Sequence, residues 1–363
     1  MTTLATSSRP NPQSPPSASP LRVVSHGETK FPPANQPRGK KLFAQCARAL
    51  KENEAVYSLC LRVFRAFQKA GISIAPNHFY WPIPDLAEIE RREWPIFDAP
   101  PGCDLRLDFQ SSFARDVATR YMGECSFAEK PTGDGEYHFN NGFFETVDAE
   151  IAYGMIRHYK PSRVIEIGSG FSTRVIAAAL KANRERENVP SELVTIDPSP
   201  ERLPQNGFDE FVTYIPQQVQ DVDMEIFASL GDGDVLFIDS SHIAGVGSDV
   251  VREYLEIIPR LNPGVIVHVH DIFFPSDYPR REVLHNLWFW SEQYLLQAFL
   301  SYNSSFEVLW ASSAMQFFHP DILKNYFPRW NQSYLRMPRA TRRFVPSLDN
   351  ERVWPSSFWM RRK

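Results

Sequence analysis

Short apolar runs that end in polar residues recur through the middle of the chain and predict the strands of one buried sheet. Four runs are rich in Val and Ile, as expected for parallel strands that are covered on both faces. They are Arg163–Ile167, Leu193–Asp197, Asp234–Asp239 and Gly264–Asp271. Three more runs complete a set of seven: Phe211–Ile215, Phe306–Trp310 and Ala314–His319. The last two are close in sequence and are expected to form an antiparallel pair.

Segments with helical spacing precede, separate and follow these runs. They are Lys40–Ala70, Ser111–Tyr121, Thr146–Tyr159, Ser172–Lys181, Gly247–Arg260 and Glu282–Leu300. Strands that alternate with helices indicate βαβ units, in which helices cover both faces of a parallel sheet. The predicted fold class is therefore α/β, with a doubly wound, seven-stranded, mostly parallel sheet and a helical N-terminal extension.

Composition along the chain predicts four parts. Residues 1–38 are rich in Pro and Ser and have few large apolar groups, so we expect them to be disordered. Residues 39–145 combine helical spacing with aromatic and proline-rich loops, which predicts an extension that could cover a substrate. Residues 146–325 hold the predicted strands and form the expected catalytic domain, and residues 326–363 form a basic C-terminal tail.

Overall composition excludes several classes of protein. The chain has 363 residues, of which 43% are hydrophobic, enough for one large or two smaller domains. A net charge of −4 gives no indication of a nucleic-acid partner. We find no apolar run long enough to span a membrane and no secretory signal. The four cysteines are widely spaced and lack a Cys-x-x-Cys pair, which argues against zinc and predicts reduced thiols in a cytoplasmic protein.

The most informative motif is a glycine turn directly after the first strand. Gly168 and Gly170 allow a sharp turn against which a ligand can lie, and the helix from Ser172 directs free N–H groups toward it. Glu166 places a carboxylate at the end of the strand, which suits a cofactor with a positive charge or an amino group, and not a diphosphate. Thr173 stands where a dinucleotide-binding fingerprint has its third glycine, which also argues against that fingerprint.

A second acidic residue, Asp197, ends the next strand. A carboxylate at this position of a βαβ unit usually binds the ribose hydroxyls of an adenosine. The alternative is an aspartate that begins the Ser/Pro turn or caps the following helix. Because Glu166 and Asp197 stand at matching ends of neighbouring strands, we favour the ribose role.

Acids and histidines also end the fourth and fifth strands. Asp239 and His242 follow the fourth strand, and His270 and Asp271 end the fifth. Open α/β sheets bind ligands at the carboxyl ends of their strands, so these side chains are candidates for catalysis. A histidine can act as a base near neutral pH. His268, on the same strand face as His270, is interpreted as a core residue.

These motifs resemble those of class I S-adenosylmethionine-dependent methyltransferases, and within that class the O-methyltransferase-like group that includes the catechol and macrocin enzymes. The resemblance covers residues from about Pro161 to Pro320 and implies a Rossmann-like methyltransferase fold. It also implies that S-adenosyl-L-methionine is the cofactor. The implied cofactor-binding residues are Glu166, Gly168, Gly170, Ser172, Asp197 and Gln220, the last because Val219–Asp221 matches a segment beside the adenine.

The same resemblance implies catalytic roles at the strand ends. Asp239, His270 and Asp271 fall on positions that hold a divalent cation in this group, and His242 falls on that of a catalytic lysine. The expected reaction is O-methylation of a small-molecule hydroxyl, with His242 and Asp239 as catalytic residues and assistance from Mg²⁺ or Mn²⁺. The alternative for His270 is a hydrogen-bonded residue that orients Asp271, without a metal.

The sequence does not decide the role of the aromatic loops, and it leaves two other classes of function possible. His78, Tyr80 and Trp81 could line a pocket, as could Tyr137, His138 and Asn140 and the loop Phe273–Pro279; packing is the alternative for each. The chain could be a non-catalytic cofactor-binding module. It could also have other chemistry, since hydroxylase-like proteins resemble this group. Neither the acceptor nor the oligomeric state follows from the sequence.

Overall fold

The computed structural model describes residues 54–73, 82–92, 99–133, 136–199, 210–330 and 355–363. The chain divides into two compact units, Met1–Pro76 and Asn77–Lys363. The described part of the first unit is the helix α2 (Glu54–Lys69) and the residues that follow it, including Gly71 with a positive φ of 76°. This helix lies within the predicted segment Lys40–Ala70. Residues 1–38 and the loop with His78, Tyr80 and Trp81 lie outside the described residues.

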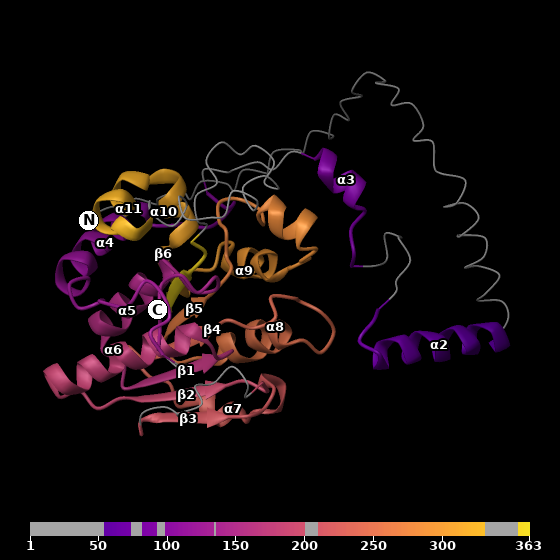
Figure 1. Cartoon of the computed structure of the whole chain (residues 1–363), viewed down its shortest axis with the longest axis horizontal. Helices are drawn as coiled ribbons and strands as arrows, with labels where there is room; N and C mark the ends of the chain where they lie inside the picture. The colour runs from indigo at the N-terminus through magenta and orange to yellow at the C-terminus, as the bar shows by residue number, and fades with distance from the viewer. Residues whose placement is uncertain (1–53, 74–81, 93–98, 134–135, 200–209, 331–354) are drawn as a thin grey trace, which may run out of the picture. The chain divides into compact units, whose positions relative to one another are not determined.

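Seven strands of the second unit form one sheet in the order β3-β2-β1-β4-β5-β7-β6, so the seven-stranded prediction is confirmed (Figure 1). Their bounds are β1 (Arg163–Ile167), β2 (Glu192–Ile196), β3 (Val212–Ile215), β4 (Val235–Ile238), β5 (Ile266–Val269), β6 (Phe306–Ala311) and β7 (Phe358–Arg362). Strands β1 to β5 are parallel, and β7 runs antiparallel to both of its neighbours. The strand order reverses between β1 and β4, which is where open sheets of this kind bind ligands.

Helices cover both faces of the sheet, as Figure 1 shows. One layer consists of α4 (Leu107–Tyr121), α5 (Asp148–Tyr159), α6 (Phe171–Glu187), α10 (Ser312–Phe318) and α11 (Pro320–Tyr326). The other consists of α7 (Met224–Ala228), α8 (Asp249–Arg252), its continuations η3 (Glu253–Ile257) and η4 (Ile258–Arg260), and α9 (Glu292–Leu300). The short elements α3 (Leu86–Arg91), η2 (Val219–Asp221) and η5 (Arg281–His285) lie in the connections.

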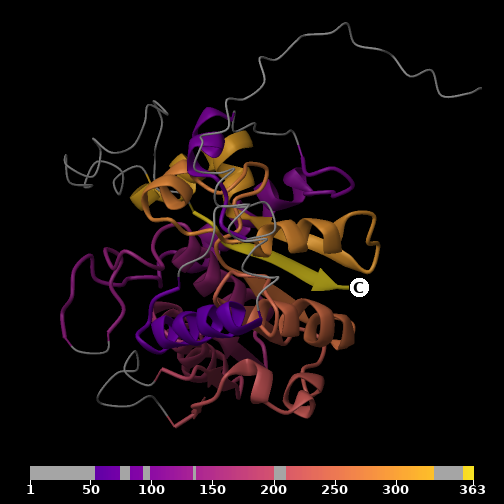
Figure 2. The ribbon, with the colours of Figure 1, turned by 90° about the vertical axis from the view of Figure 1, so that its right-hand side faces the viewer.

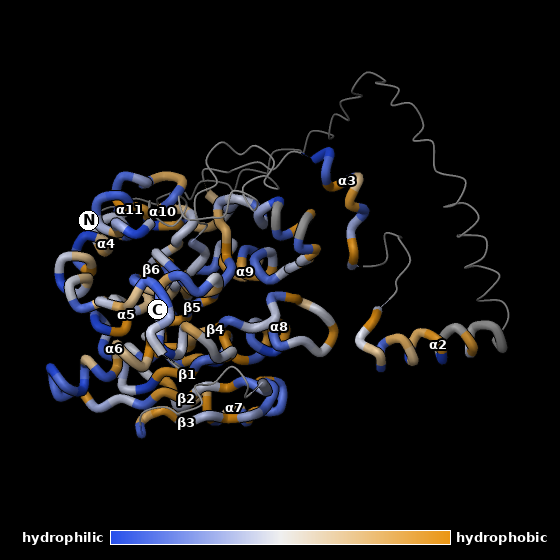
Figure 3. Tube along the Cα trace, in the orientation of Figure 1, coloured by the Kyte–Doolittle hydropathy of each residue, from blue (hydrophilic) through white to orange (hydrophobic). Residues whose placement is uncertain are grey.

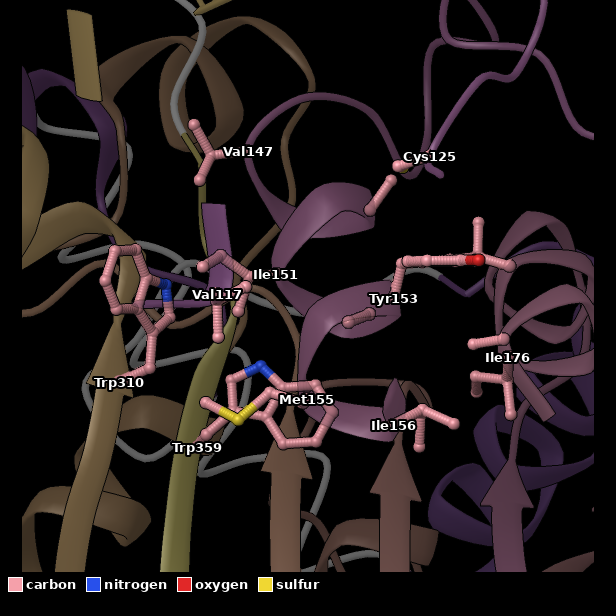
Figure 4. Close-up of a cluster of buried hydrophobic side chains, with 14 of the residues drawn as sticks. Val117, Cys125, Val147, Ile151, Tyr153, Met155, Ile156, Ile176, Trp310 and Trp359 are labelled. Atoms are coloured by element: carbon pink, nitrogen blue, oxygen red, sulfur yellow. The ribbon is translucent and has the colours of Figure 1, made fainter. Parts of the chain in front are cut away.

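Each face of the sheet has its own hydrophobic core. Along β1, Val164 packs with the α5 and α6 side, whereas Ile165 packs with the α8 and α9 side. This alternation follows from the two-residue period of a strand. In Figure 3, hydrophobic residues follow the paths of β1, β2 and β3. Figure 4 shows part of the first core, to which α5 contributes Ile151 and Met155 and β7 contributes Trp359.

The prediction of a strand at Ala314–His319 is wrong, because Ser312–Phe318 forms the helix α10. Ala314 and Met315 are buried there, so their apolar character reflects helix packing. The seventh strand is β7, near the end of the segment predicted as a basic tail; Figure 2 shows it running to the C-terminus. Phe358 and Trp359 are fully buried, and Arg361 pairs with Glu307 of the neighbouring β6.

Two other differences concern the helices and the N-terminal extension. The predicted helix Glu282–Leu300 is interrupted between η5 and α9, at Leu287 with a positive φ of 59°. The extension contributes to the core of the second unit, since Phe113, Phe139 and Phe144 are buried against α5 and the sheet. The predicted helices that became α4, α5 and α6 are confirmed.

Candidate cofactor and catalytic site

The two glycines of the turn after β1 meet different surroundings. Gly168 has a positive φ of 87°, and a Cβ there would collide with the backbone oxygen of Asp239. The turn therefore packs directly on the end of β4, and its first glycine is required by that close approach. A Cβ on Gly170 would meet no atom within 4 Å, so this part of the turn borders open space. Gly170 is thus the position at which a ligand could lie against the backbone.

Glu166 is buried beneath this turn. Its Oε1 accepts a hydrogen bond of 2.7 Å from Ser172 Oγ in the first turn of α6. Its Oε2 is buried and has no hydrogen-bond partner in the described part of the chain. Burial raises the pKa of Glu166 to about 7, although the nearby hydroxyl groups of Thr173, Ser172 and Thr195 act in the opposite direction. Glu166 and Ser172 therefore join β1 to the start of α6.

Asp197 lies at the end of β2 and contacts the same turn. Its Oδ2 accepts hydrogen bonds from the backbone N (2.8 Å) and the Oγ (3.0 Å) of Ser169. Its Oδ1 accepts from the backbone N of Ser199 at 2.7 Å, as expected for an aspartate that begins a turn. Both sequence interpretations of Asp197 are compatible with this geometry. Gln220, in η2, donates from Nε2 to the carbonyl of Gly247 at 3.1 Å.

The four polar residues at the ends of β4 and β5 converge. His242 Nε2 lies 3.5 Å from Asp239 Oδ1 and 3.3 Å from Asp271 Oδ2. His270 Nδ1 lies 3.5 Å from Asp239 Oδ1 and 3.7 Å from Asp271 Oδ1. The sheet topology thus brings together the side chains that the sequence singled out. We call these four residues the strand-end cluster.

A carboxylate lies behind each histidine of the cluster. His242 Nδ1 is 2.8 Å from Glu292 Oε2 at the start of α9. His270 Nε2 is 3.6 Å from Asp148 Oδ2 at the start of α5. Such carboxylates fix the orientation and the tautomer of an imidazole. Sequence analysis missed Asp148 and Glu292; both stand in the first turn of a helix, a position that acids favour for reasons unrelated to catalysis.

The segment that leads into β7 completes this arrangement. Asp148 Oδ2 accepts from the backbone N of Ser356 (2.8 Å), and its Oδ1 accepts from that of Ser357 (3.0 Å). Ser356 Oγ donates to Asp271 Oδ1 at 3.0 Å. Residues near the C-terminus therefore position the cluster at the ends of β4 and β5.

The charges of the cluster shift the pKa values of its members. Burial alone would lower the pKa of His242, but hydrogen bonds with Asp239 and Glu292 raise this pKa well above its usual range. Burial acts in the same way on His270, and the charges of Asp271 and Asp239 raise its pKa. Burial would raise the pKa of Asp239, whereas the charge of His270 and contacts with His242 hold it far below normal. The two carboxylates therefore favour the protonated form of both imidazoles.

Backbone strain accompanies the cluster. His242 and Asp271 both have positive φ angles, 62° and 55°, which non-glycine residues adopt uncommonly. Each such residue costs on the order of 1–3 kcal/mol and persists where the surrounding structure fixes it, most often at functional sites.

The described side chains do not form a ready metal site. No group of three or more His, Cys, Asp or Glu residues in the described ranges is arranged to hold a metal ion. The metal prediction for Asp239, His270 and Asp271 therefore finds no support in their arrangement, and we derive no step through a metal.

The other residues that the sequence singled out pack against, or form hydrogen bonds with, neighbouring residues of the protein. His268 is fully buried and stacks on Phe237 at 3.7 Å, so the interpretation as a core residue is confirmed. Tyr137 is buried, and its hydroxyl donates to the carbonyl of Phe144 at 2.7 Å. Asn140 donates from Nδ2 to the carbonyl of Glu129 at 2.6 Å. The ring of His138 lies edge-on to that of Phe171, the first residue of α6, with their centroids 5.2 Å apart.

Comparison with known proteins identifies the domain. Residues 165–272, which run from β1 past the end of β5, match the family model of a methyltransferase domain. With the strand order described above, this match defines a class I methyltransferase, the class that uses S-adenosylmethionine. The chain belongs to the same family as an uncharacterized protein of Archaeoglobus fulgidus, with 34% identity over 172 residues, 45% of this chain and 76% of that protein.

Two solved structures of methyltransferases are similar to this chain at lower sequence identity. The S-adenosylhomocysteine-bound methyltransferase PaMTH1 of Podospora anserina is 15% identical, with a TM-score of 0.35, over 80% of this chain and 99% of that one. An O-methyltransferase from Bacillus cereus is 13% identical, with a TM-score of 0.28, over 54% of this chain and 82% of that one. Within the described residues, no helix is both long and apolar enough to cross a membrane.

Proposed function

We propose that this protein transfers the methyl group of S-adenosylmethionine to a hydroxyl group of a small molecule, with His242 as the general base. One observation carries the proposal: the glycine turn and the candidate base meet at Asp239. The backbone oxygen of Asp239 packs against Gly168, and its side chain lies 3.5 Å from His242 Nε2. A cofactor against the turn would therefore have its reactive end directed toward a histidine.

The chemistry requires a deprotonated acceptor. Bound S-adenosylmethionine supplies a methyl group on a positively charged sulfur, which is already activated for transfer. Neutral His242 accepts the hydroxyl proton at Nε2 while the acceptor oxygen forms its bond to the methyl carbon, and the C–S bond breaks with its electron pair on sulfur. Glu292, 2.8 Å from Nδ1, orients the ring and stabilises the imidazolium that results.

The rest of the cluster positions this base. Asp239 and Asp271 approach Nε2 from the neighbouring strand ends, and His270 lies between the same two carboxylates. Positioning of reactants in a fixed geometry is itself a large part of catalysis in such transfers. The four residues of the cluster follow β4 and β5, and Glu292 begins α9, so regular elements of the fold position these side chains.

Metabolite profiling of a strain that lacks this protein tests the function. A hydroxyl-bearing compound lighter by one methyl group should accumulate, and the purified protein should methylate it with labelled S-adenosylmethionine. His242→Gln should lower kcat far more than cofactor affinity, because a base acts mainly in the transition state. His158→Gln, on α5 and away from the cluster, is the matched control. Wild-type kcat in His242→Gln would contradict the role of the base.

A further inference from the structure

Among the residues that the structure describes, Arg174 is a cation without an ion-pair partner, and it lies next to the glycine turn. It stands in the fourth position of α6, and its guanidinium lies over the ring of Phe171, 4.7 Å from the centroid. Side chains on a helix point toward the helix N-terminus, so this one is directed back toward the turn. Its Nε is buried without a hydrogen-bond partner, and we find no ion pair between Arg174 and any residue that the structure describes.

The surroundings of Arg174 are aromatic rather than acidic. Phe143 stacks on Phe171 at 6.1 Å with an interplanar angle of 15°, and His138 meets the same ring edge-on. Phe143 is 79% exposed, so this group lies at the surface of the molecule. Partial burial among these groups lowers the pKa of Arg174 because it removes water from the charge. A half-buried guanidinium whose Nε has no hydrogen-bond partner is stabilised when an anion binds it.

The start of α6 favours an anion at the same place. The first N–H groups of a helix lack intrahelical partners and carry partial positive charge. One flanking group is satisfied, since the backbone N of Gly170 donates to Thr173 Oγ1 at 2.9 Å. The space beside Gly170 is open. A guanidinium and a helix N-terminus thus border the same turn.

We infer that Arg174 binds the carboxylate of the methionine part of the cofactor. This inference rests on the proposed function, which places S-adenosylmethionine against the glycine turn. The carboxylate is the only anionic group of that molecule. The acceptor is expected at the strand-end cluster, whose residues follow β4 and β5, whereas Arg174 belongs to the helix that follows β1. The observed positive groups therefore match the cofactor rather than the acceptor.

Titration calorimetry with two ligands tests the inference. S-adenosylhomocysteine carries the carboxylate, and decarboxylated S-adenosylhomocysteine keeps the amine but lacks it. Arg174→Gln should weaken binding of the first about 10- to 100-fold, as for loss of a charged hydrogen bond, and leave binding of the second within about twofold. Arg184→Gln is the matched control, because Arg184 also lies on α6 with its guanidinium over a phenylalanine, Phe211, at 5.1 Å.

The outcomes separate the two claims. Equal loss for both ligands, or no loss for either, overturns the role of Arg174, and thermal melting identifies a variant that has not folded. Arg174→Lys keeps the charge and should recover part of the affinity for S-adenosylhomocysteine alone; a failure to do so also counts against the inference. If the wild-type protein does not bind S-adenosylhomocysteine, the proposed function is overturned and this inference with it.

Discussion

His242 and His270 approach the same oxygen atom: a ring nitrogen of each lies 3.5 Å from Asp239 Oδ1. The two rings come from different strand ends, and each has its own carboxylate behind it. This symmetry explains why the pKa of both imidazoles is raised and why that of Asp239 is lowered. It also means that His242 must lose a proton before it can serve as a base.

The pH dependence of kcat follows from this arrangement. A histidine whose pKa is raised is protonated at neutral pH, so the fraction of active base increases as the pH rises above the ordinary histidine value of about 6.5. The rate should therefore continue to rise with pH beyond neutrality. Glu292→Gln removes one group that raises this pKa and should shift the rise to lower pH. A pH profile that is the same in both proteins would contradict the assignment.

Chelation tests whether the cluster works without a metal. The carboxylates of Asp239 and Asp271 are already in contact with the imidazoles of His242 and His270, so EDTA should leave both kcat and the melting temperature unchanged. The measurement is the methyl-transfer rate before and after exhaustive dialysis against EDTA. Loss of activity that Mn²⁺ or Mg²⁺ restores would contradict this expectation and support the metal site predicted from the sequence.

The two glycines of the turn should respond differently to the same substitution. Gly168→Ala forces a Cβ onto the backbone of Asp239 at a positive φ, and should lower the free energy of unfolding by at least about 2 kcal/mol. Gly170→Ala adds a methyl group to open space, so the protein should fold normally but bind S-adenosylhomocysteine more weakly. Urea denaturation and calorimetry measure the two effects. Unchanged ligand affinity in Gly170→Ala would show that no ligand lies there.

Glu166 should make stability depend on pH. Its pKa is about 7 in the folded protein, so the folded state keeps a proton that the unfolded state loses near the ordinary glutamate value of about 4.3. Stability should therefore fall as the pH rises from about 4 to about 7, by up to about 3 kcal/mol, and then level off. Glu166→Gln has no such proton to lose. Urea denaturation at pH 5 and pH 8 should show a smaller difference in this variant than in the wild type, and equal differences would refute the pKa.

Much of the sheet and of the cluster could be predicted because the signals are local. A strand such as β4 is a continuous apolar run, and the polar residues that follow it, Asp239 and His242, necessarily lie at its carboxyl end. Parallel pairing of β4 with β5 then brings them next to His270 and Asp271, which follow β5. The glycine turn has an equally local pattern. These predictions needed only chain order and the rules of βαβ units.

The parts that sequence analysis missed depend on contacts between distant segments. Ser356 lies far from Asp148 in the sequence, yet its backbone N–H binds that carboxylate. The strand β7 follows a long segment and ends in arginines, which masked its buried start. The apolar residues of the run predicted as a strand are buried in the helix α10. A short apolar run does not show by its pattern alone whether it forms a buried helix or a buried strand. In the sequence Arg174 is an ordinary helix residue, and only the structure shows that none of the described residues forms an ion pair with it.

Binding of S-adenosylhomocysteine, measured by titration calorimetry on the wild type and on Asp197→Ala, tests the central claim most directly. Asp197 adjoins the glycine turn through Ser169, where a ribose hydroxyl could bind. We expect saturable binding with one site per chain in the wild type, weakened at least about tenfold in a folded Asp197→Ala variant. Absence of binding to the wild type would contradict the assignment of the cofactor, and equal affinity in the two proteins would contradict its placement.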